Sequence, residues 1–132
     1  MALSGTQSRT QKQRNLVGRR TVGDIETGIT ATASGNQATA YQLTRSFSVL
    51  GTVATNADSV KLPTDRRVGD EVIIVNDGAA NAQVFGSGTD TIDGVATATG
   101  VVLTAAKRCS YYCVSITAGV AAWLSNMGAK SA

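Results

Sequence analysis

The side chains in this chain that could do chemistry are two pairs of carboxylates, Asp70 with Glu71 and Asp90 with Asp93. Paired carboxylates can serve as general acid and base or can bind calcium. Neither pair belongs to the series of alternating acids and fixed glycine that forms a calcium loop. Asp and Asn also cap turns and strand ends, and we expect that role for both pairs.

Histidine does not occur in the sequence, so a Ser–His–Asp or Cys–His arrangement cannot be built from this chain. The two cysteines, Cys109 and Cys113, lie in an apolar run of strand length. In a strand they would stand roughly 13 Å apart at about 3.3 Å per residue, whereas a disulfide needs Cα atoms within about 7 Å. We therefore expect free, buried thiols and no metal site or cofactor, since two cysteines alone cannot complete a tetrahedral zinc site.

Basic residues gather at the N-terminus. Residues 1–20 contain no acidic side chain and carry all five of these: Arg9, Lys12, Arg14, Arg19 and Arg20. Such a segment could contact nucleic acid, an acidic protein surface or an anionic membrane, or it could be a solvated tail. It has no aromatic residue to stack on a base, so a protein partner is favoured and nucleic acid is unlikely. A smaller basic group, Lys61 with Arg66 and Arg67, could touch phosphate or lie in an exposed loop.

Small residues dominate the composition. Ala, Thr, Gly and Ser account for 61 of 132 residues, and aromatic residues for 5%. Small side chains bury little apolar area, at about 25 cal/mol per Å², so the core should be thin. A thin core favours association of identical copies, because their contact adds the missing burial.

Short apolar, β-branched runs closed by Pro, Gly, Asn or Asp indicate strands. No helix-period segment or membrane span is present, nor is a secretory signal, so we expect a soluble protein made in a host cytoplasm. The fold class expected is all-β, a small antiparallel β-sandwich or barrel, jelly-roll-like, with residues 1–39 as a basic N-terminal arm and linker and residues 40–132 as the domain. The strands should cover residues 41–44, 47–53, 59–62, 71–76, 82–85, 91–92, 101–103, 108–116 and 121–126.

Two of these runs, 72–75 and 111–116, are apolar on both faces and should be central strands. Asp77-Gly78 is a turn-forming pair that predicts a hairpin between strands 71–76 and 82–85. Trp123, the only tryptophan, should be a core side chain. A single oligomer or core face is expected to carry Val72, Ile74, Tyr112, Val114 and Trp123.

Several of these runs together resemble a β module of tailed-bacteriophage virion proteins, found in head decoration (cement) proteins, head fibres and tail fibres. The runs that carry the resemblance are 60–63, Gly69, 72–76, 84–85, 90–94, Leu103 and Trp123. The resemblance covers roughly residues 40–126. It implies an all-β, usually trimeric structural unit of the virion with no enzymatic activity. The strand 108–116, with its two cysteines and two tyrosines, departs from the small or apolar residues usual there.

Taken together, these features predict a capsid decoration protein that binds and stabilises the major-capsid shell as a homotrimer on the virion surface. The partners expected are the major capsid protein and further copies of this chain. The basic arm would contact the capsid. The alternative is a tail-fibre or other host-surface-binding virion module.

Overall fold

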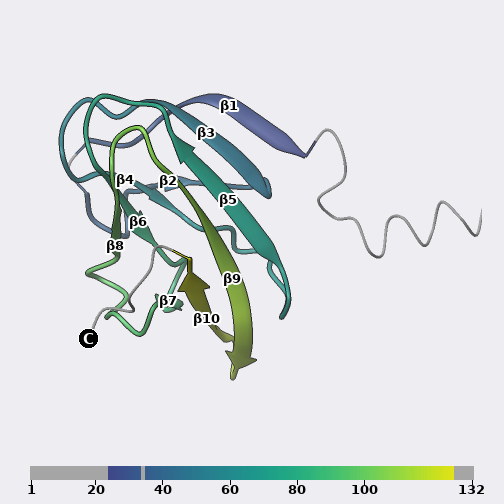
Figure 1. Ribbon diagram of the computed structural model, residues 1–132. Coiled ribbons are helices and arrows are strands. Elements are labelled where there is room, and N and C mark those ends of the chain that lie inside the picture. The colour runs from purple at the N-terminus through teal and green to yellow at the C-terminus, as the bar shows by residue number, and fades with distance from the viewer. Residues whose placement is uncertain (1–23, 34, 127–132) are drawn as a thin grey trace, which may run out of the picture.

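The computed structural model describes residues 24–33 and 35–126, and these form two stacked β-sheets with no helix (Figure 1). The larger sheet contains six strands in the order β1-β3-β5-β9-β10-β7, and the smaller contains four in the order β2-β4-β6-β8. The all-β prediction is confirmed, and the two packed layers are consistent with a sandwich.

The ten strands begin and end close to where apolar runs meet turn residues. They are β1 Ile25–Thr30, β2 Tyr41–Gln42, β3 Phe47–Thr52, β4 Asp58–Lys61, β5 Glu71–Asn76, β6 Ala82–Phe85, β7 Thr91–Ile92, β8 Val101–Leu103, β9 Arg108–Thr117 and β10 Val120–Ser125. The nine expected strands are all present, with bounds that differ by at most two residues. The additional strand, β1, pairs with β3 although its residues were assigned to the arm and linker. The domain therefore includes residues 25–30, and the boundary at residue 39 was placed too late.

The antiparallel expectation is wrong for most of the pairings. Five of the eight strand pairs are parallel: β1 with β3, β3 with β5, β2 with β4, β4 with β6, and β10 with β7. From β1 to β6 consecutive strands alternate between the sheets, so each pair of consecutive strands adds one strand to each layer. We call each such pair a coil, and the three coils are β1–β2, β3–β4 and β5–β6. This pairing differs from that of a jelly roll, whose neighbouring strands are antiparallel.

The predicted hairpin at Asp77-Gly78 is also absent, because β5 and β6 lie in different sheets. The buried Asn76 amide directs the crossover. Its Nδ2 donates to the carbonyl oxygens of Ala80 and Leu103, both at 3.0 Å, and its Oδ1 accepts from the Gly78 N–H. A Cβ atom at Gly78 would lie 2.5 Å from the Val53 nitrogen, so only glycine fits against β3's end.

Antiparallel strands close the last coil. β9 pairs with β5 and β10 in the larger sheet, and β8 pairs with β6 in the smaller one. The central position expected for β5 and β9 is confirmed. The core between the layers is mostly aliphatic, and its largest fully buried side chains are Trp123, Tyr111, Phe85, Leu43, Leu50, Leu62 and Ile74.

Candidate functional site

The outer face of the six-stranded sheet is the most apolar exposed surface of the described residues. Seven large apolar side chains are exposed, and five of them are on the strands of this sheet: Ile25, Tyr112, Val114, Val120 and Leu124. Monomeric proteins rarely expose contiguous apolar surface of this kind, so it indicates an interaction surface.

Strand register places these apolar side chains in two groups on one side of the sheet, with Glu71, Ser110 and Arg108 paired at the boundary between β5 and β9. Residues paired across neighbouring strands lie on the same face of a sheet. One row joins Ile25, Phe47 and Ile73 across β1, β3 and β5. A second row joins Tyr112 of β9 to Leu124 of β10. We call the exposed or half-buried apolar side chains of these rows, together with Val49, Val75 and Val114, the outer face.

Register also corrects the single oligomer or core face expected from the sequence. Val72 pairs with Tyr111, and Ile74 pairs with Cys109, so it is Tyr111 and not Tyr112 that shares the buried side with Val72. Val72, Ile74 and Trp123 are buried, whereas Tyr112 is 38% and Val114 45% exposed. The five residues therefore divide between the core and the outer face. Both sides of β9 are apolar enough that alternation alone could not distinguish them.

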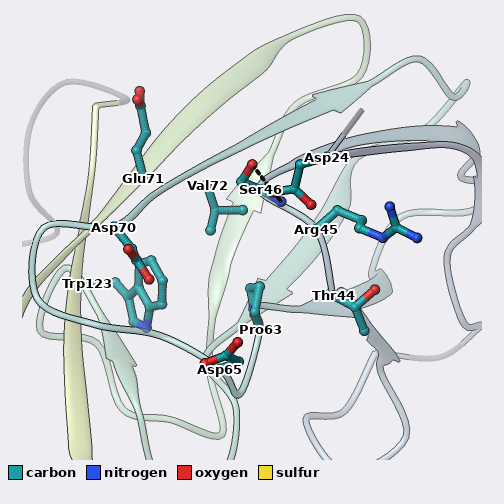
Figure 2. Close-up of a pocket in the computed structure, with 10 residues that line it drawn as sticks. All are labelled: Asp24, Thr44, Arg45, Ser46, Pro63, Asp65, Asp70, Glu71, Val72 and Trp123. Atoms are coloured by element: carbon teal, nitrogen blue, oxygen red, sulfur yellow. Dashed lines mark hydrogen bonds between the residues drawn. The ribbon is translucent and has the colours of Figure 1, made fainter. Parts of the chain in front are cut away.

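A cavity of about 300 Å³ lies at one end of the sandwich, where the parallel strands β1, β3 and β5 begin (Figure 2). Strands that run in the same direction bring their N-terminal ends to one edge of the sheet, and the loops that return from the smaller sheet meet there. The lining residues are Asp24, Thr44, Arg45, Ser46, Pro63, Asp65, Asp70, Glu71, Val72 and Trp123.

Hydrogen bonds hold the rim of the cavity in shape. Asp24 Oδ2 accepts from the Ser46 N–H at 3.1 Å and from the Ser46 hydroxyl at 2.5 Å. The Ile73 N–H donates to the Ser46 carbonyl at 2.8 Å, and Asp70 Oδ2 accepts from the Arg67 N–H at 2.8 Å. The cavity thus has four carboxylates and one guanidinium on its lining, which gives it a negative character.

Trp123 closes the inner wall of the cavity, and its prediction as a core side chain is confirmed at 1% exposure. Its indole nitrogen is buried and has no hydrogen-bond partner among the described residues. In Figure 2 the indole nitrogen lies on the side of the ring that faces Asp65 rather than Glu71. A buried donor without an acceptor costs about 1–3 kcal/mol, so this N–H would gain from an acceptor supplied by a ligand.

Comparison of this chain with protein-family models, curated proteins and solved structures gave no match.

The other residues singled out for chemistry have structural roles. Asp90 is buried and pairs with Arg66, whose Nε and Nη2 donate to its two carboxylate oxygens at 2.8 Å. Asp93 accepts from the Ser125 N–H and hydroxyl, at 2.8 and 2.6 Å. Both carboxylates thereby attach the loop around β7 to β10. Both carboxylates are buried and bind residues at least 24 positions away, so their role is long-range and differs from the local turn-capping or solvated strand ends expected.

Both cysteines are free and buried, as predicted. Burial raises the pKa of the Cys109 and Cys113 thiols. Two members of the basic group considered from the sequence have partners within the domain, since Lys61 Nζ donates to the Ala38 carbonyl and Arg66 pairs with Asp90. Among the described residues no set of three or more Cys, Asp or Glu side chains is placed to hold a metal ion. The described part of the chain also has no helix long and apolar enough to cross a membrane.

The five basic residues of the expected capsid-contact arm, at positions 9–20, lie outside the described residues.

Proposed function

We propose that this chain is a structural subunit of a phage virion, a capsid decoration protein that associates with itself as a trimer and stabilises the major-capsid shell. The observation that carries the proposal is the outer face. The domain exposes apolar side chains of β1, β9 and β10 on one side of its larger sheet, and association of copies would bury them.

The way in which the reactive groups are used supports a structural rather than a catalytic role. Asp90 and Asp93 hold β10 in place, and Cys109 and Cys113 pack in the core. The arm adds a second contact in this proposal. Its basic side chains Arg9, Lys12 and Arg14 would reach an acidic surface of the shell.

Sedimentation equilibrium of the full chain tests the association. We expect a trimer for the native protein and a monomer for the double variant Val114→Glu/Leu124→Glu, because a buried charge in an apolar contact is costly. Val102 is exposed to a similar extent, 48%, but belongs to β8 of the smaller sheet. Val102→Glu is therefore the matched control and should remain a trimer. A native monomer would contradict the self-association.

Binding to purified capsids that lack this protein tests the location. The native chain should occupy the shell, and Arg9→Gln/Lys12→Gln/Arg14→Gln should reduce occupancy and make it less salt-sensitive. Antibody label at the tail in electron micrographs, with none over the shell, would contradict the decoration role.

The second candidate is a tail-fibre or other host-surface-binding module, in which the cavity would take a polar group of the host surface. Its lining carries carboxylates and the hydroxyls of Thr44 and Ser46. Label at the tail would support this candidate.

A further inference from the structure

The cavity carries three features that identify a ligand chemistry. It is lined by four carboxylates against one guanidinium, it has a volume of about 300 Å³, and its lining includes Trp123, whose buried indole N–H lacks an acceptor among the described residues. A ligand that suits all three is a cationic side chain attached to a group that can accept a hydrogen bond. A peptide arginine meets this description, because its guanidinium donates to carboxylates and the neighbouring peptide carbonyl accepts from an indole N–H.

A saccharide fits these features less well. Sugar rings commonly stack on the exposed face of an aromatic side chain, but Trp123 is only 1% exposed. The negative lining moreover favours a cation over a neutral ligand.

We propose that the cavity binds an arginine side chain of a basic peptide, and that the occupant is the Arg19-Arg20 pair of this chain's own N-terminal segment. Charge is complementary, since residues 1–20 carry five basic and no acidic side chains. Position is also favourable, because Asp24 lies on the rim and Arg20 precedes it by only four residues. Four residues span at most roughly 13 Å, a length that allows Arg19 or Arg20 to contact the cavity with little loss of chain entropy.

This binding would anchor the inner end of the arm on the domain and leave Arg9, Lys12 and Arg14 to extend away from it. It stands independently of the capsid, because it concerns a contact within the chain or between copies of it. An arm anchored in this way would lose less entropy when its outer part binds a partner.

The single tryptophan makes the test direct, because the full chain labelled with ¹⁵N has one indole N–H signal in a two-dimensional NMR spectrum. Arg19→Gln/Arg20→Gln should shift this signal to the position it takes in the native chain at high salt. Arg9→Gln/Lys12→Gln removes the same charge farther from Asp24 and should leave the signal in place. Equal shifts from both variants, or none from either, would overturn the proposal.

Substitutions in the cavity provide the reciprocal measurement. Asp70→Asn keeps an oxygen for the Arg67 N–H but removes one negative charge from the lining, and it should reproduce the shift seen with Arg19→Gln/Arg20→Gln. Asp77→Asn changes the same charge on an exposed turn outside the cavity and serves as the control. In the combined variant the two effects should not add, because both remove one interaction.

Two further outcomes are informative. Dilution of the native chain should leave the signal unchanged if the arm binds its own domain, and should move it toward the high-salt position if the arm binds a neighbouring copy; either result supports the proposal. A shift caused by added monosaccharides, with no response to Arg19→Gln/Arg20→Gln, would overturn it in favour of a saccharide site. None of these outcomes depends on capsid binding, so failure here and failure of the decoration role are separate results.

Discussion

Arg66 and Asp90 form a two-pronged ion pair across 24 residues of sequence, with both N–H···O distances at 2.8 Å. Asp90 is 1% exposed and also accepts from the Ala121 N–H at 2.8 Å, and Arg66 Nη2 donates to the Gly119 carbonyl. One pair of side chains thus joins the loop before β5, the loop before β7 and the turn that begins β10.

Arg66→Ala should lower the free energy of unfolding by about 3 kcal/mol, because it leaves the buried Asp90 charge without its partner. Urea unfolding followed by Trp123 fluorescence measures this change. Arg67→Ala removes an adjacent exposed arginine and should stay within about 0.5 kcal/mol of the native value. Equal losses for the two variants would show that the ion pair contributes nothing specific.

Tyr111→Phe should stabilise the domain by about 1 kcal/mol. The Tyr111 hydroxyl is buried and has no partner among the described residues, so its removal relieves a desolvation penalty. Tyr112→Phe, on the exposed side of β9, is the control and should be neutral. A loss of stability in Tyr111→Phe would mean that the hydroxyl is satisfied.

The same substitution should change the dependence of stability on alkaline pH. Burial raises the pKa of Tyr111 well above its ordinary value of 10.0, so the folded chain keeps this proton while the unfolded chain releases it. The unfolded state then binds fewer protons, and the free energy of unfolding falls as pH rises above 10.0. Unfolding curves at increasing pH should show a smaller fall for Tyr111→Phe, and parallel curves would contradict this reasoning.

Asn76→Asp should cost about 3 kcal/mol at neutral pH, because a carboxylate would face the carbonyl oxygens of Ala80 and Leu103 where the amide now donates. A protonated carboxyl can donate one of these bonds, so the variant should recover part of the loss as the pH is lowered. Asn56→Asp keeps the acceptor used by the Asn81 N–H and should change stability little. Equal losses of stability in the two variants would show that Asn76 does not direct the crossover.

Cys109 and Cys113 should react slowly with an aromatic disulfide reagent in the folded protein. Both thiols are buried, and burial raises the pKa of each, which lowers the thiolate fraction at neutral pH. Absorbance of the released thiolate should report two reactive groups only after unfolding in guanidinium. Rapid reaction of the native protein would show that this part of β9 opens readily.

The strands could be predicted from sequence because each is a short apolar run ended by turn residues. The pairing could not, because a loop such as 77–81 is long enough either to close a hairpin or to cross to the other sheet. The choice depends on tertiary contacts, namely the buried Asn76 amide and the close packing of Gly78 on Val53. β1 was missed because its glycine and polar residues weaken the alternation.

The candidate site was predicted only in part. The burial of Trp123 followed from its type and position, but the cavity beside it collects side chains from five separate segments. Nothing local in the sequence shows that Asp24, Asp65 and Asp70 converge. Tyr112 and Val114 were expected on the same face as Val72. Both faces of β9 carry bulky residues, so only the register with β5 shows that Tyr111, and not Tyr112, shares the face of Val72.

The coils β1–β2, β3–β4 and β5–β6 stack so that each strand pairs in parallel with the corresponding strand of the next coil. In such a quasi-one-dimensional stack the cross-section stays constant, and the length along the stacking direction depends on the number of coils. Duplicating the β3–β4 coil would add one strand to each sheet and lengthen the domain, while the closing strands β8, β9 and β10 would stay unchanged. The same architecture could thus give either a short or an elongated domain through a change in the number of coils alone.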